Sequence, residues 1–231
     1  MLSFDRFEVL TFDCYGTLID WEPGILSALK PLLASRNVLL ADEELLELYA
    51  EFESAVERGA YIPYRLVLRK TVKEFGRRFS FVPSESELQY LEDSLPHWKP
   101  FADTVDALRA LKFKYRLAII SNIDDDLFQG SAAHLKVDFD HVITARQAQS
   151  YKPSLNIFNV AINRIGVPKD QILHVAQSMY HDMVPAKQLG LATAWVNRRH
   201  WQDGFGATPP ATGMPDLEVP DLQSFVKTIG I

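Results

Sequence analysis

The fold is decided by the stretch Phe7-Glu8-Val9-Leu10-Thr11-Phe12-Asp13-Cys14-Tyr15-Gly16-Thr17-Leu18. Its apolar first half ends at Asp13, and a turn containing Gly16 follows. A short apolar run closed by turn residues is typical of a buried strand. In an open parallel sheet, the loops after the strands form the ligand-binding crevice. Asp13 is therefore a candidate reactive group, although the spacing alone equally allows it to cap the turn.

Alternating strands and helices are predicted again from residue 100 onward. The expected strands cover residues 116–120, 141–144, 172–176 and 193–196. The expected helices cover residues 102–114, 154–165 and 222–229. One further helix is expected to begin at residue 124, and another is expected to end at residue 189. This alternation predicts an α/β protein with a doubly wound, Rossmann-like parallel sheet. Many glycines and prolines in residues 204–220 predict a surface excursion.

The segment between the first strand and this α/β region has a different pattern of apolar residues. Apolar residues recur at helical spacing, as in Ile25, Leu29 and Leu32, and predict several consecutive amphipathic helices. Ser84 and Glu87 have the spacing of a capping box, which predicts the start of the fourth helix. We therefore expect an α/β core domain of residues 1–18 and 97–231 and a helical cap domain of residues 19–96.

Composition narrows the class of protein. The chain has 231 residues, of which 47% are hydrophobic and 23% are charged, and its net charge is -6. These values predict a folded, soluble protein, and the acidic balance argues against nucleic acid as its partner. We find neither a signal peptide nor an apolar run long enough to span a membrane. The single cysteine, Cys14, fits a reducing compartment, so we expect a cytoplasmic protein.

Polar groups follow several of the predicted strands. Asp13, the pair Ser121-Asn122 and the segment from Gln177 to Asp182 each come directly after a strand, and Lys152 lies in a loop before a helix. Such groups converge on one crevice in a parallel sheet. Each also has a plainer interpretation. Lys152 could be a solvated loop residue, Ser121-Asn122 could cap the next helix, and Asp182 could be an acid favoured by a helix dipole.

The order of these residues resembles the four motifs of the haloacid dehalogenase superfamily. Asp13-Cys14-Tyr15-Gly16-Thr17-Leu18 is similar to its first motif, and Ser121, Lys152 and Asp182 match the second, third and fourth motifs. The resemblance covers essentially the full length. It implies that Asp13 is a nucleophile that forms an ester, which water then cleaves. Thr17 would orient Asp13, and Asp182 would position Lys152 or the hydrolytic water.

The resemblance also implies a substrate class. Tyr15 replaces the acid that phosphatases of the superfamily carry two residues after the nucleophile, which is the pattern of the (S)-2-haloacid dehalogenase branch. Ser121 and Lys152 would hold a small 2-haloacid by its carboxylate, Asn122 would receive the halide, and Ser178 would line the substrate site with Tyr15. No cofactor is implied, although Asp13 and Asp182 could bind Mg²⁺ weakly. A homodimer through the cap helices is also possible.

Gln177 stands where phosphatases of the superfamily carry an acid that helps to hold magnesium, which weakens that alternative. Two departures from the dehalogenase branch leave the substrate open. The halide-contacting Arg of the dehalogenases is absent from residues 41–55, although Arg58, Arg65 and Arg69 follow. Phe158 replaces a Tyr of that branch.

Three functions remain open from the sequence. They are a metal-independent 2-haloacid dehalogenase, another hydrolase of the same fold such as a Mg²⁺-dependent phosphatase, and a binding or regulatory protein without turnover. Halide release would favour the first, a magnesium requirement the second, and ligand binding without turnover the third.

Overall fold

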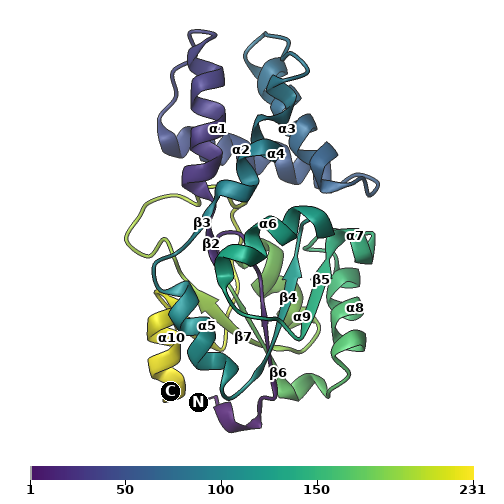
Figure 1. Cartoon of the computed structure of the whole chain (residues 1–231), viewed down its shortest axis with the longest axis vertical. Helices are drawn as coiled ribbons and strands as arrows, with labels where there is room; N and C mark the ends of the chain where they lie inside the picture. Colours follow the sequence, from purple (N-terminus) through teal and green to yellow (C-terminus); the bar gives the residue numbers. More distant parts are fainter. Residues whose placement is uncertain (1) are drawn as a thin grey trace.

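A six-stranded parallel sheet forms the core of the computed structural model, which describes residues 2–231 (Figure 1). Its strands, in the spatial order β5-β4-β1-β6-β7-β8, are β5 (His141–Thr144), β4 (Arg116–Ser121), β1 (Val9–Phe12), β6 (Ile172–Ala176), β7 (Ala192–Val196) and β8 (Leu217–Val219). β1 pairs with β4 on one side and β6 on the other, and every residue of β1 is buried. The predicted parallel α/β core is confirmed.

Helices pack on both faces of the sheet. α5 (Thr104–Lys112) contacts α6 (Asp125–Leu135) and α10 (Leu222–Ile229). On the other side, α8 (Leu155–Ile165) contacts α7 (Ala145–Ala148) and α9 (Val184–Gln188). Short 3-10 helices, η1 (Phe4–Arg6) and η4 (Lys169–Gln171), precede β1 and β6. Both chain ends lie at the end of the sheet opposite the site described below (Figure 1).

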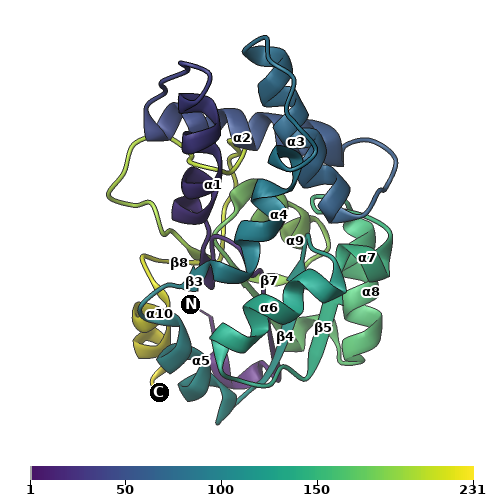
Figure 2. The ribbon, with the colours of Figure 1, turned by 45° about the horizontal axis from the view of Figure 1, so that its top comes forward.

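The helical segment from Glu22 to His97, called the insertion below, lies beyond the carboxyl ends of the strands (Figures 1 and 2). It contains α1 (Glu22–Ala34), α2 (Asp42–Glu57), α3 (Tyr64–Arg78), η2 (Glu87–Gln89), α4 (Tyr90–Ser94) and η3 (Leu95–His97). The capping box is present, because Ser84 Oγ accepts the Glu87 N–H at 3.3 Å and Glu87 accepts the Ser84 N–H at 2.7 Å. It opens a short 3-10 turn before α4 rather than one long helix.

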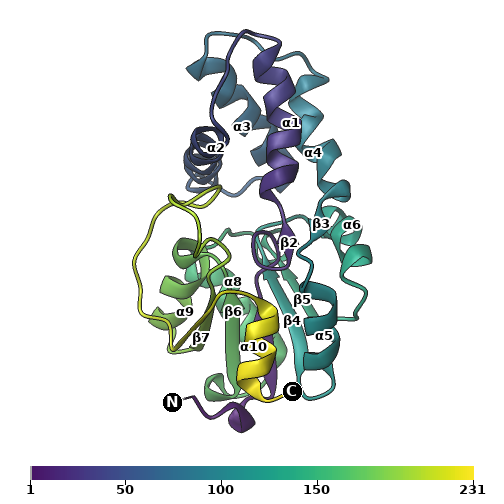
Figure 3. The ribbon, with the colours of Figure 1, turned by 90° about the vertical axis from the view of Figure 1, so that its left-hand side faces the viewer.

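Two features that tie the insertion to the core were not predicted. β2 (Ile19–Asp20) and β3 (Lys99–Pro100) form a small antiparallel pair where the chain passes between the two parts (Figure 3). The expected surface excursion at residues 204–220 is wrong in part, because it contains β8 and packs against the insertion. Glu43 accepts the Gly206 N–H at 3.0 Å, and Ala207 is fully buried.

Arg199, just before this segment, forms ion pairs with Glu22 and Glu43 of the insertion. The loop after β7 therefore contacts the insertion as well as the sheet. Between residues 2 and 231, none of the helices has the length and apolar character needed to cross a membrane.

Candidate active site

Asp13 lies directly after β1 and is 6% exposed. Its Oδ2 accepts the Thr17 hydroxyl at 2.7 Å, and Thr17 Oγ1 accepts the Gln177 N–H at 2.8 Å. The intervening turn depends on Gly16, whose φ is +86° and where a Cβ would lie 3.0 Å from Trp21 Nε1. The neighbouring Cys14 thiol is fully buried, and burial raises its pKa well above its usual range.

Lys152 connects the loop after β1 to the segment after β6 that carries Asp182. Its side chain is 2% exposed, and Nζ donates to Asp13 Oδ1 at 2.8 Å, to Asp182 Oδ1 at 2.8 Å and to the Ile120 carbonyl at 3.0 Å. An ammonium group has three N–H donors, so all are used within the protein. Lys152 is therefore not the solvated loop residue of the plainer interpretation, and in this conformation it has no donor left for a substrate carboxylate.

Asn122 fixes the backbone around Lys152. Its Oδ1 accepts the Lys152 N–H at 2.7 Å, and its Nδ2 donates to the Lys152 carbonyl at 3.1 Å and to Glu57 Oε2 at 3.2 Å. These contacts explain why the amide lies between β4 and the Lys152 loop. The amide donors that could receive a departing halide are occupied by the protein.

The charges of this cluster are unequal, because one ammonium faces two carboxylates. Burial raises the pKa of Asp13, while Lys152 and the Thr17 hydroxyl favour its ionised form. Burial alone would lower the pKa of Lys152, yet Asp13 and Asp182 raise it overall. We conclude that Lys152 is charged, because three acceptors surround it. A charged Lys152 holds Asp13 as the ionised carboxylate that nucleophilic attack requires.

Asp182 lies on a π-helical turn, Met179–Met183, where the sequence predicted a loop that ends at Asp182. It is fully buried, and its Oδ1 lies 2.9 Å from His174 Nε2 as well as 2.8 Å from Lys152 Nζ. Thr11 Oγ1 lies 2.9 Å from His174 Nδ1, which fits an imidazole that donates to Asp182. Burial by itself would raise the pKa of Asp182. The contacts of Asp182 lower its pKa overall, and the contact with Lys152 has the largest effect among them. Asp182 is thus part of the cluster and more than a helix-dipole acid.

The insertion contributes acids that sequence reasoning missed. Glu53 Oε1 accepts the hydroxyls of Tyr49 and Tyr64 at 2.7 and 2.5 Å, and the Glu57 side chain is only 5% exposed. Burial raises the pKa of Glu53 to about 7 and that of Glu57 well above its usual range. The signal was present in α2, because Leu45, Tyr49, Glu53 and Glu57 recur every four residues and share one face.

The pKa of Glu53 predicts a pH dependence of stability. Because its folded pKa of about 7 exceeds the unfolded value of 4.5, the folded state binds more protons between these limits. The contribution of Glu53 to the free energy of unfolding is therefore lost as the pH rises through this window. The loss is about 3 kcal/mol, at 1.36 kcal/mol per pKa unit. We expect the stability of Glu53→Gln relative to wild type to increase by roughly 2–3 kcal/mol between pH 5 and pH 8.

Urea unfolding at both pH values measures this change. Glu51→Gln, an exposed acid of the same helix, serves as the control and should show no such trend. An equal pH dependence in wild type and Glu53→Gln would contradict the assignment.

A cavity of about 30 Å³ lies between the site residues of the core and the acids of the insertion. It has room for about one or two water molecules. Seven of the eight predicted site residues line it, namely Asp13, Tyr15, Ser121, Asn122, Lys152, Ser178 and Asp182. Thr17 lies behind Asp13. The other walls are Trp21, Glu53, Glu57, Tyr64, His181 and Thr208. Three buried polar atoms here have no partner: Ser121 Oγ, His181 Nε2 and Asp182 Oδ2.

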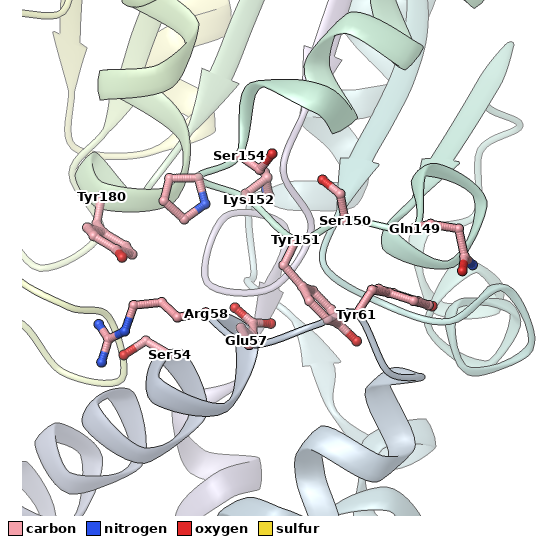
Figure 4. A pocket seen from close by; sticks show the side chains of 12 residues that line it. Ser54, Glu57, Arg58, Tyr61, Gln149, Ser150, Tyr151, Lys152, Ser154 and Tyr180 are labelled. Atoms are coloured by element: carbon pink, nitrogen blue, oxygen red, sulfur yellow. The ribbon is translucent and has the colours of Figure 1, made fainter.

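A larger pocket of about 330 Å³ adjoins this cavity and shares Glu57 and Lys152 with it. Figure 4 shows Glu57 directed from α2 toward the Lys152 loop, while Arg58 extends to the other side, toward Tyr180. Arg58 is the only one of the three candidate arginines to line either of these two pockets. The larger pocket therefore lies directly beside the cavity, on the side of Glu57 and Lys152.

The remaining candidate residues make ion pairs or packing contacts within the protein. Arg65 and Arg69 both pair with Glu92 of α4, and Arg65 also contacts Asp126. The Tyr15 ring lines the cavity, but its hydroxyl lies 2.8 Å from Ser131 Oγ of α6 and is used there. Phe158 is fully buried against the His174 ring, with centroids 5.2 Å apart.

The fold and site together define an α/β protein with a buried, lysine-paired aspartate after the first strand of its sheet. A solved structure has the same fold: an L-2-haloacid dehalogenase from Xanthobacter autotrophicus with chloropropionic acid covalently bound aligns with a TM-score of 0.79 at 20% identity, covering 96% of this chain and 98% of that one. At this identity the match shows the fold alone.

Two curated relatives have different activities. An (S)-2-haloacid dehalogenase from Pseudomonas putida is 29% identical over 217 residues, covering 87% of this chain and 91% of the relative. A glyceraldehyde 3-phosphate phosphatase from Methanothermobacter thermautotrophicus is 30% identical over 203 residues, covering 82% and 85%. The model of the haloacid dehalogenase-like hydrolases matches residues 7–190, and the chain belongs to this family.

Proposed function

We propose that the protein hydrolyses the carbon–halogen bond of a small 2-haloacid and releases a 2-hydroxy acid and halide. One observation carries this proposal: Asp13 is held as an aimed carboxylate by Lys152 and Thr17, and the residue two positions on is Tyr15. The Tyr15 hydroxyl lies against Ser131, and burial raises its pKa well above the usual range, so it is a poor proton donor to a leaving group. A halide needs none. The dehalogenase relatives support the same activity.

The reaction has two steps. Asp13 Oδ1 or Oδ2 attacks the carbon that bears the halogen, the carbon–halogen bond breaks, and the electron pair leaves with the halide. The product of this step is an ester of Asp13. Water then attacks the ester carbonyl carbon, and the 2-hydroxy acid leaves. Thr17 and Lys152 fix the direction of the carboxylate in the first step, which lowers the entropic cost of the attack.

Substrate entry requires movement, because a cavity of about 30 Å³ is too small for a 2-haloacid. We propose that residues 1–18 and 97–231 form a core domain and that residues 19–96 form a cap domain that opens at the β2–β3 pair. Arg58 in the larger pocket would attract the anionic substrate, and Ser121 Oγ is a free hydroxyl for its carboxylate.

A cytoplasmic location and a homodimer complete the proposal. The single buried cysteine supports a reducing compartment. Leu39 and Val82 of the insertion are 85% and 90% exposed, and they offer apolar surface for a second copy. Light scattering of the purified protein would test the dimer.

Halide release from L- and D-2-chloropropionate, beside phosphate release from an aryl phosphate, tests the proposed reaction. We expect halide from one enantiomer only, at a rate unaffected by EDTA. The physical reason is that the Lys152 ammonium already neutralises charge between Asp13 and Asp182, and Gln177 adds no carboxylate for Mg²⁺.

Two outcomes would contradict this proposal. Phosphate release that requires magnesium would favour the activity of the phosphatase relative. Binding of haloacids without release of halide would favour a protein that kept the fold and lost turnover.

A further inference from the structure

His181 occupies an unusual position for a residue with no assigned role. It lies on the π-helical turn Met179–Met183, one residue before Asp182, and lines the cavity together with Asp13. π-helical turns are rare and occur frequently at functional sites. His181 is 8% exposed, and its Nε2 is buried without a hydrogen-bond partner. A buried polar atom without a partner is costly unless a ligand or water completes it.

The ring is oriented by Ser178. Ser178 Oγ accepts the His181 N–H at 2.9 Å and lies 3.2 Å from His181 Nδ1. When Nδ1 donates its proton to this oxygen, Nε2 carries the free lone pair, on the side of Glu57, which also lines the cavity. Burial lowers the pKa of His181 to about 4, so the imidazole is neutral at pH 7. Glu57 Oε2, from the insertion, lies 4.0 Å from Nε2.

We propose that His181 is the general base that activates water for hydrolysis of the Asp13 ester, with Glu57 stabilising the imidazolium that forms. This inference rests on the proposed two-step reaction. Water gives a proton to Nε2, and its oxygen bonds to the ester carbonyl carbon of Asp13. The bond from that carbon to the alkyl oxygen then breaks, and the hydroxy-acid oxygen takes the proton from Nε2. The second proton of the water is released, which restores the Asp13 carboxylate.

Asp182 Oδ2 is the other unpartnered acceptor in the cavity, but charge argues against it. Once Asp13 is an ester, Asp182 is the only ionised carboxylate that contacts Lys152. Protonating Asp182 would then leave a buried ammonium unpaired, which is strongly unfavourable. A proton on His181 instead leaves the Asp182–Lys152 ion pair intact, and the charge of Asp182 favours the imidazolium while that of Lys152 opposes it. His181 is therefore the better acceptor at this stage.

The arrangement couples hydrolysis to closure of the insertion. His181 belongs to the core and Glu57 to α2, so the pair meets only when the two parts are together. The space between them adjoins a cavity with room for about one or two water molecules.

The test is a rapid-quench comparison of wild type with His181→Gln on the reactive 2-chloropropionate enantiomer. For His181→Gln we expect a burst of one halide per enzyme, followed by turnover slowed about 10²–10⁴-fold. Intact-protein mass spectrometry should show the accumulated ester, and peptide mapping should place it on Asp13. His200→Gln, an exposed histidine, is the matched control and should behave as wild type.

Glu57→Gln should show the same split with a smaller loss in the second phase. If His181→Gln turns over at the wild-type rate, or loses the burst together with turnover, the role of His181 is overturned while the proposed reaction stands. If the wild type itself releases no halide from any 2-haloacid, the proposed function fails and the role of His181 fails with it.

Discussion

Asp13→Asn is expected to lower turnover by at least about 10³-fold while preserving the fold. An amide is too poor a nucleophile to displace halide, so no ester forms. The fold should survive because Lys152 still pairs with Asp182 at 2.8 Å, and because the cluster has one carboxylate more than its single ammonium can neutralise. Halide release and thermal unfolding of the same preparation check both statements.

A second readout separates a nucleophile from a merely structural acid. With enzyme in excess over substrate in ¹⁸O-water, the first turnover of the wild type should give a hydroxy acid without label, because its new oxygen comes from Asp13. Asp106→Asn, an acid on α5 whose side chain is 89% exposed, is the matched control and should keep the wild-type rate. Full activity of Asp13→Asn, or labelled product in the first turnover, would remove Asp13 from this role.

Lys152→Met is expected to destabilise the protein by about 3–5 kcal/mol and to abolish activity. The substitution keeps the length of the side chain but leaves two buried carboxylates without the ammonium that lies 2.8 Å from each. The loss should shrink as the pH falls, because without Lys152 the pKa values of Asp13 and Asp182 rise and protonation then relieves the buried charge.

Guanidinium unfolding at pH 5 and pH 8 measures this effect. Lys112→Met is the matched control, because Lys112 pairs with Asp140 with both side chains about one-third exposed, and its loss should cost about 0–1 kcal/mol. A Lys152→Met protein as stable as this control would show that the buried cluster does not hold the loops together.

The core half of the site was predictable because its residues lie at the ends of strands. Asp13 and Asn122 directly follow β1 and β4, and Ser121 is the last residue of β4. The parallel sheet brings such positions together. A strand can be predicted from the spacing of its apolar residues and from the turn residues beside it, which are local properties of the chain. Lys152 was predictable only through its motif, since nothing local distinguishes a buried loop lysine from a solvated one.

The insertion half of the site was not predictable in the same way. Whether Glu57 points to solvent or to Asn122 depends on how α2 sits on the core, and no local pattern encodes that angle. The π-helical turn that carries His181 was likewise invisible, because it depends on one backbone register within a short loop. The segment at residues 204–220 was misjudged because glycine and proline report turns, but not what the turns pack against.

The buried position of Cys14 has a chemical consequence for an enzyme of this proposed activity. A 2-haloacid is an alkylating agent, and it attacks thiols only as their thiolates. The chain has one thiol, which is fully buried next to the nucleophile, and its raised pKa keeps it protonated. The substrate therefore reaches a carboxylate whose ester water can cleave, and no thiolate that would form a stable thioether. Such an enzyme is protected against self-inactivation by its own substrate.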